Sequence, residues 1–221
     1  MSLLTPMLRS SPLTDWFSDA QRVQGMLDFE AALAQAQAAC GMVPTAAVGP
    51  IVAACRHEAI DFTALGEAAV GAGNLAIPLV KQLTAQVKAR DPDAARYVHW
   101  GATSQDAIDT GLVLQLRGAL EAAETLLEQL LAALALQADR YRDTVMPGRT
   151  WMQHALPVTF GLKLAGTLDA LLRWQQRLRE MRPRLLVLQF GGAAVSLDAL
   201  KEKVPAVVLV LAHILCLSLP A

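Results

Sequence analysis

Apolar residues between positions 112 and 134 recur every three or four residues, over about six turns of an α-helix. The residues on this stripe are Leu112, Leu116, Leu120, Ala123, Leu127, Leu130 and Leu134. The period predicts one long helix with a coiled-coil-like seam, which begins after Thr103 and Ser104. Other helices must cover a seam of that length, so this stretch constrains the fold more than any other.

A second long helix is predicted after Pro147 and Gly148, which interrupt the first one. It is expected to begin near Ala155 and to run until Pro183. Two long helices joined by a loop predict an all-α fold, a long-helix bundle. Their apolar seams are too wide to be covered by each other alone. We therefore expect further helices from this chain or from copies of it, and oligomerisation through the bundle.

The first part of the chain carries signals for shorter helices. One is predicted from a cap at Thr14 or Ser18 to a stop near Gly41, and further helical segments follow it. We expect an N-terminal helical domain over residues 1–102 and a central long-helix bundle domain over residues 103–221.

The composition argues against several classes of protein. With 221 residues, 54% of them hydrophobic, the chain can bury a sizeable core. The 19 basic and 20 acidic residues nearly cancel and form no basic stripe, so nucleic acid is not expected as a partner.

The cysteines and the most apolar run indicate where the protein is found. Cys40, Cys55 and Cys216 form no CxxC pair and follow no secretory leader, which predicts a cytoplasmic protein without disulfides or a zinc site. The most apolar run, residues 206–219, is shorter than the roughly 20 residues that a bilayer requires. We expect a buried helix there and no membrane partner.

Residues 97–109, YVHWGATSQDAID, gather polar and aromatic side chains just before the first long helix. Thr103, Ser104 and Asp106 fit a helix N-cap with an acid in the first turn. The nearby residues that a cap leaves unexplained are His99, Trp100 and Gln105. Free N–H groups and hydroxyls at a helix N-terminus also form an anion site. The residues alone leave a simple cap and a carboxylate-binding site as equal alternatives.

A second cluster, PGRTWMQHALPVTFG at residues 147–161, lies where the second long helix is expected to begin. Arg149 can bind a carboxylate through two hydrogen bonds, and Thr150 and Gln153 can supply neutral ones. Trp151 can exclude water from a pocket. The alternative is a helix-initiating turn with a solvated Arg149 and Trp151 packed in the core. Two polar loops at the heads of two long helices favour a binding site.

The segments HWGATSQDAIDT and GRTWMQHALPVTFG resemble the first two signature regions of the fumarase/aspartase superfamily, in its adenylosuccinate-lyase-like branch. The similarity extends to the opening SPLTDWFSDAQRVQGMLDFEAALAQAQAACGMVP and to RLLVLQFGGAA, so it covers nearly the whole chain. Within the superfamily, the motifs are similar to those of bacterial 3-carboxy-cis,cis-muconate cycloisomerases. The resemblance implies an L-aspartase-like helix bundle, a homotetramer whose active sites each draw on three subunits, and no metal or redox cofactor.

The resemblance also implies the chemistry and the residues that carry it. A carboxylate of a small polycarboxylate, a cis,cis-muconate, is expected to add across a double bond and form a γ-lactone, in protocatechuate catabolism. His99 is expected to act as a polar contact or proton relay, and Trp151 to shape and dry the pocket. The expected catalytic residues are His99, Ser104 and Trp151, and the expected substrate-binding residues are Asn74, Thr103, Gln105, Arg149, Thr150 and Gln153.

Two departures from the superfamily pattern leave alternatives open. Adenylosuccinate lyases typically carry a histidine where this chain has Trp151, and a His-Asp pair where it has Gly73-Asn74. A C–N lyase must protonate its departing nitrogen and would lack those imidazoles here, whereas a cyclisation has no separate leaving group to protonate. An adenylosuccinate-lyase-like activity is therefore kept as the first alternative. The third signature, Gly-Ser-Ser-x-Met-Pro-x-Lys-x-Asn, does not occur in the 221 residues. The bundle is therefore expected to lack its C-terminal part, and the second alternative is an inactive helical oligomerisation fragment. The choice between a 3-carboxy and a 3-sulfo muconate stays open.

Overall fold

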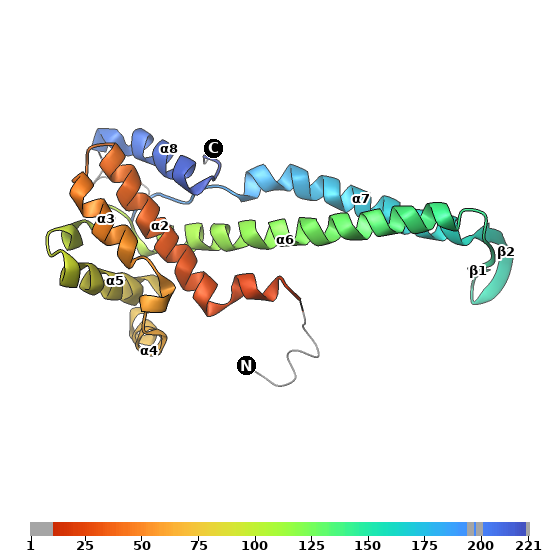
Figure 1. Cartoon of the computed structure of the whole chain (residues 1–221), viewed down its shortest axis with the longest axis horizontal. Helices are drawn as coiled ribbons and strands as arrows, with labels where there is room; N and C mark the ends of the chain where they lie inside the picture. The colour runs from red at the N-terminus through yellow and green to blue at the C-terminus, as the bar shows by residue number, and fades with distance from the viewer. Residues whose placement is uncertain (1–10, 194–196, 198–200, 220–221) are drawn as a thin grey trace. The chain divides into compact units, whose positions relative to one another are not determined.

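The computed structural model describes residues 11–193, 197 and 201–219. The chain forms two compact units (Figure 1). Unit 1 comprises Met1–Gly118 and Arg184–Ala221, and unit 2 comprises Ala119–Pro183. Helices dominate both units, which confirms the predicted all-α class. The division into domains at residue 103 stays a prediction.

Unit 1 is built from helices around α2 (Figure 1). Its helices are α2 (Asp19–Ala39), α3 (Thr45–Ala54), α4 (Phe62–Ala72), α5 (Ala76–Arg90), the first part of α6 (Ser104–Arg140) and α8 (Val204–Leu215). Its short 3-10 turns are η1 (Thr14–Phe17), η2 (His57–Ala59), η3 (Ala94–Tyr97) and η4 (Lys201–Lys203). Helix α2 packs against α3 and α8 and buries Leu27, Phe29 and Leu33. It is therefore the central helix of the unit 1 core.

Local sequence signals set the helix ends of unit 1. The backbone N–H of Gln21 donates to Ser18 Oγ at 3.3 Å, so the predicted cap at Ser18 is confirmed. Thr14 instead begins the separate turn η1. Gly41, two residues beyond the end of α2, has a φ of +65°, a conformation that glycine adopts without strain.

Helix α8 lies largely within the apolar run at residues 206–219, for which the sequence predicted a buried helix. Val207, Leu211 and Leu215 are buried, whereas Leu209 and His213 are exposed. The predicted buried helix thus exists, but only one of its faces is covered in this chain. Among the described residues, no helix has both the length and the apolar character required to cross a membrane.

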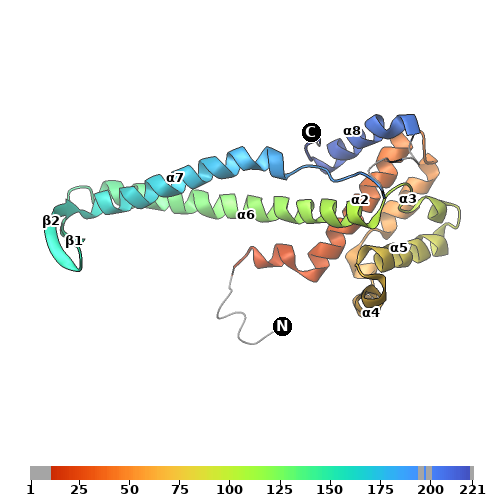
Figure 2. The ribbon, with the colours of Figure 1, turned by 180° about the vertical axis from the view of Figure 1, so that it is seen from behind.

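Unit 2 contains the remainder of α6 and most of α7 (Phe160–Leu185), which run side by side (Figures 1 and 2). The Arg182 guanidinium donates to Glu124 Oε2 at 2.6 Å and to Glu121 Oε1 at 2.9 Å, which joins the two helices. The large exposed apolar side chains of these two helices in unit 2 are Leu126, Leu130, Leu136, Leu162, Leu172, Trp174 and Met181. The pair leaves part of its apolar seams uncovered, as the sequence predicted.

The segment between the two long helices differs from the prediction. It is a β-hairpin of β1 (Val145–Thr150) and β2 (Gln153–Thr159), and α7 begins at Phe160 instead of near Ala155. Pro147 pairs with Pro157 across the hairpin, and neither proline can donate a helical hydrogen bond. The backbone N–H of Leu162 donates to Thr159 Oγ1 at 3.1 Å, so Thr159 caps the new helix. The predicted helix start at Ala155 is therefore wrong.

Candidate functional site

A cavity of about 400 Å³ lies in unit 1, between helix α5 and the loop that leads into α6. Its polar lining consists of Lys81, His99, Thr103 and Ser104, and its apolar lining includes Ile77 and Val80. An ammonium group, an imidazole and two hydroxyls suit a ligand that carries anionic oxygen atoms. The cavity brings together three of the predicted site residues, His99, Thr103 and Ser104.

Two helix N-termini meet at this cavity. Helix α5 begins at Ala76 and α6 begins at Ser104, and both residues belong to the cavity lining. The first N–H groups of a helix have no partner within the helix and carry the positive end of its dipole. This arrangement favours binding of a carboxylate at either end.

His99 is held by an acid from helix α2, Glu30. His99 Nδ1 lies 2.5 Å from Glu30 Oε1, and Glu30 is 2% exposed. Burial lowers the pKa of His99, but the hydrogen bond to Glu30 and the charges of Glu30 and Asp106 raise it, and the net shift is upward. The contact with Glu30 therefore stabilises the protonated form of His99 relative to an isolated histidine.

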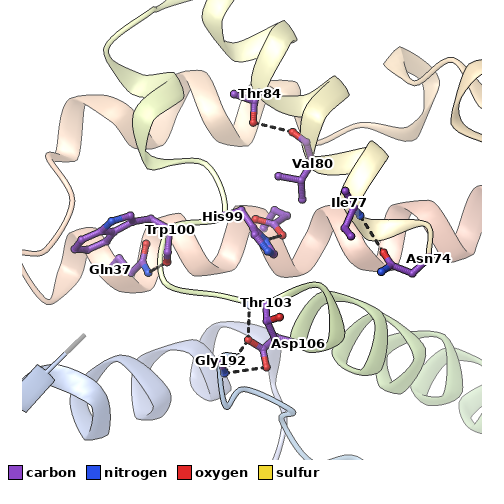
Figure 3. Close-up of polar contacts among 11 residues, drawn as sticks. Gln37, Asn74, Ile77, Val80, Thr84, His99, Trp100, Thr103, Asp106 and Gly192 are labelled. Carbon is purple, nitrogen blue, oxygen red and sulfur yellow. Dashed lines mark hydrogen bonds and ion pairs between the residues drawn. The ribbon is translucent and has the colours of Figure 1, made fainter. Parts of the chain in front are cut away.

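Asp106 forms the cap of α6 and also a link to a distant segment (Figure 3). Its Oδ2 accepts the backbone N–H of Thr103 at 2.9 Å, and its Oδ1 accepts that of Gly191 at 2.9 Å. The N–H of Gly192 also donates to this carboxylate, at 3.1 Å to Oδ2. Asp106 is 6% exposed. The carboxylate therefore fixes the Thr103 loop against the Gly191-Gly192 turn.

Two other predicted residues lie near this cavity but do not line it. Asn74 Oδ1 accepts the backbone N–H of Ile77 at 3.1 Å and so caps α5 (Figure 3). Gln105 Nε2 donates to Asp109 Oδ1 at 2.6 Å on an exposed part of α6. Their assignment to substrate binding stays a prediction.

The second predicted cluster belongs to unit 2, on the β-hairpin. Arg149 and Lys163 line a cavity of about 350 Å³ there, together with Leu162. Thr150 pairs with Gln153, and neither lines that cavity. Trp151, in the hairpin turn between them, is 92% exposed, so the alternative in which it packs in this chain's core is wrong. The roles of these residues in binding stay predictions.

The lyase family model matches residues 8–220, nearly the whole chain. The chain belongs to the fumarase/aspartase superfamily. This confirms the resemblance of the two signature segments.

Known members of the superfamily are similar to this chain to different degrees. A 3-carboxy-cis,cis-muconate cycloisomerase from Pseudomonas aeruginosa is 61% identical over 211 residues, which cover 96% of this chain and 46% of that protein. The crystal structure of the 3-carboxy-cis,cis-muconate lactonizing enzyme from Pseudomonas putida matches with a TM-score of 0.96 at 55% identity, over 99% of this chain and 50% of that one. An adenylosuccinate lyase from Methanothermobacter thermautotrophicus is 38% identical over 182 residues, which cover 82% of this chain and 40% of that protein. The chain thus spans about half the length of the relatives it matches.

Two residues at the candidate site were not predicted from the sequence. Glu30 is an acid within the apolar stretch LDFEAALAQ of α2, and its position among buried residues is a signal that could have been noticed. Lys81 lies on α5 without any local motif. Only the packing of α5 beside the Thr103 loop places Lys81 at the cavity.

Proposed function

We propose that this chain provides the first two signature regions of a 3-carboxy-cis,cis-muconate cycloisomerase. The product would be a γ-carboxymuconolactone, in protocatechuate catabolism, and the enzyme would act in the cytoplasm. The observation that carries the proposal is the cavity at two helix N-termini, lined by Lys81, His99, Thr103 and Ser104, in a chain 61% identical to such an enzyme.

The chemistry of lactonization matches the groups at this cavity. A carboxylate oxygen of the substrate forms a C–O bond to one alkene carbon, and a proton adds to a neighbouring carbon, so no group departs. Negative charge develops on a carboxylate conjugated to the reacting carbon. The α6 N-terminus with Thr103 and Ser104 would stabilise that charge, and loss of one such donor typically costs roughly 10² to 10³ in rate. His99 would supply a polar contact or relay the proton.

The second signature region would complete the site from another copy of the chain. Arg149, Thr150 and Gln153 would bind a further carboxylate, and Trp151 would close the pocket against water. The exposed Trp151 and the uncovered apolar side chains of α6 and α7 support assembly, which we propose to be a homotetramer. Asn74 and Gln105 would contribute further polar contacts to the substrate.

The 221 residues alone are expected to show no turnover. The third signature does not occur in them, and in the superfamily it supplies a serine implicated as the catalytic base. Folded chain without activity would match the second alternative, a helical oligomerisation fragment, for these residues taken by themselves. Activity must therefore be tested with the third region present.

A chimera tests the proposal directly. The part of the Pseudomonas aeruginosa relative that follows the matched residues is joined after Leu219, and the loss of the conjugated diene's ultraviolet absorbance is followed with 3-carboxy-cis,cis-muconate. The same chimera is given adenylosuccinate and a 3-sulfo muconate. We expect turnover of the 3-carboxy substrate and none of adenylosuccinate, because Trp151 and Gly73 replace the imidazoles that could protonate a departing nitrogen. Cleavage of adenylosuccinate at a comparable rate would contradict the proposal.

A further inference from the structure

Helix α2 contacts the His99 turn through two buried polar side chains, Glu30 and Gln37, of which Figure 3 labels Gln37. Glu30 Oε1 lies 2.5 Å from His99 Nδ1, and Gln37 Nε2 donates to the carbonyl oxygen of Trp100 at 2.6 Å. Residues seven positions apart lie on the same side of an α-helix. One face of α2 therefore holds two consecutive residues of the turn.

The turn has a backbone conformation that needs such support. His99 has a φ of +57° and Gly101 a φ of +73°. The left-handed region is unfavourable for a residue with a Cβ, whereas glycine adopts it freely. Contacts from elsewhere in the fold must hold His99 in this conformation.

Burial of Glu30 is itself unfavourable for folding. Within the part of the chain that the structure describes, Glu30 Oε2 and Gln37 Oε1 are buried without a hydrogen-bond partner. A buried carboxylate with one unpartnered oxygen is costly, and an apolar residue of similar volume would pack there without that cost. Packing of α2 does not account for an acid at this position, but the hydrogen bond between Glu30 and His99 does.

We infer that Glu30 is a positioning residue, which fixes the ring orientation and the proton arrangement of His99 for the reaction at the cavity. An ionised carboxylate only accepts hydrogen bonds, so the hydrogen of this contact lies on His99 Nδ1. Nε2 is then the ring nitrogen that can exchange a proton with a ligand beside Lys81, Thr103 and Ser104. The catalytic part of this inference rests on the proposed function, whereas the contact itself can be tested without any substrate.

Nuclear magnetic resonance of the 221-residue chain tests the contact. Histidine is labelled with ¹⁵N, and the His99 signals are assigned from their loss in His99→Gln. In the wild-type chain we expect the Nδ1–H form of the neutral ring, and a His99 pKa that falls in Glu30→Gln. The matched control is Asp28→Asn, which removes an acid from the exposed side of the same helix and should leave His99 unchanged. An Nε2–H ring in the wild-type chain, or an unchanged His99 pKa in folded Glu30→Gln, would overturn the inference.

A double-mutant cycle in the chimera tests the catalytic part. Glu30→Gln should lower kcat by about 10²-fold, the size of a lost acid–base contribution, with little change in KM. In a His99→Gln background, the same change should have no further effect on kcat, because Glu30 acts through His99. Equal losses in both backgrounds would overturn the inference. If the wild-type chimera turned over no muconate, the proposed function would fail, and the magnetic resonance result would still decide the Glu30–His99 contact.

Discussion

Gly25 of α2 and Gly111 of α6 lie in direct backbone contact. A Cβ atom on Gly25 would lie 2.7 Å from the carbonyl oxygen of Gly111, and a Cβ on Gly111 would lie 2.9 Å from the backbone nitrogen of Met26. Helix backbones can approach this closely only where both residues lack a side chain. The crossing brings the first turns of α6 against the helix that carries Glu30.

Replacement of Gly25 by alanine should therefore destabilise unit 1. The added methyl group meets backbone instead of a flexible side chain, and we expect a loss of about 1–3 kcal/mol in the free energy of unfolding. Urea denaturation measures it. Gly66→Ala is the control, because this exposed glycine of α4 has no neighbour within 4 Å, and alanine there should stabilise by about 1 kcal/mol. Equal stability of Gly25→Ala and wild type would mean that the two helices do not touch in solution.

Asp106→Asn should loosen the Thr103 loop. The amide retains one acceptor oxygen, whereas the carboxylate accepts N–H groups of Thr103, Gly191 and Gly192 through two. We expect a loss of roughly 1.5–3 kcal/mol, the usual contribution of a buried hydrogen bond to a charged group. Asp109→Asn, whose only described partner is the exposed Gln105, should change stability little. Amide hydrogen exchange at Thr103 provides the local measurement, and unchanged protection in Asp106→Asn would contradict the role of this carboxylate.

The Glu30–His99 pair predicts a specific pH dependence of stability. The net upward shift of the His99 pKa means that the folded chain binds more protons than the unfolded chain at pH values between 6.5, the ordinary histidine pKa, and the raised value. The free energy of unfolding therefore falls as pH rises through this window, and the contribution of the pair is complete below 6.5. Urea denaturation across a pH series measures this fall. In His99→Gln it should be smaller, and an identical slope in wild type and variant would count against the pair.

The two residues of the hairpin turn are unfavourable for the stability of the hairpin, although Trp151 is proposed to serve the function. Trp151 and Met152 both have positive φ, +48° and +60°, in the two-residue turn between Thr150 and Gln153. Asn-Gly suits such a turn better, so Trp151→Asn with Met152→Gly should stabilise the hairpin by roughly 1–2 kcal/mol. Slower amide exchange of the β1 and β2 residues would show the gain. The same double variant should lower turnover by the chimera, and full activity with a stabilised hairpin would remove Trp151 from the proposed site.

Lys81→Met should weaken substrate binding at the first cavity. Loss of one charged hydrogen bond of about 2 kcal/mol corresponds to a roughly 30-fold rise in KM. Lys88→Met, in the last turn of the same helix and outside the cavity lining, is the matched control and should leave KM unchanged. Steady-state kinetics of the chimera with 3-carboxy-cis,cis-muconate measures both. Equal KM values for the two variants would show that the Lys81 ammonium does not contact the substrate.

The sequence by itself determined the elements whose causes are local. A helix and its caps depend on residues three or four positions apart, so the period from Leu112 to Leu134, the cap at Ser18 and the stop near Gly41 were all visible in the chain. The Thr103 loop could be found for the same reason, because its polar residues are contiguous. The hairpin at Pro147 was missed, because a short strand pair depends on cross-strand partners and on a turn without glycine.

Tertiary structure alone decided which distant residues complete the site. Glu30 reaches His99 across 69 positions of sequence, and Gly192 reaches Asp106 across 86. Lys81 comes to the cavity only because α5 packs beside the loop before α6. The burial of apolar side chains drives helix packing, but the hydrophobic effect is not directional. The sequence pattern therefore predicts that the helices pack together, but not which polar side chains come into contact.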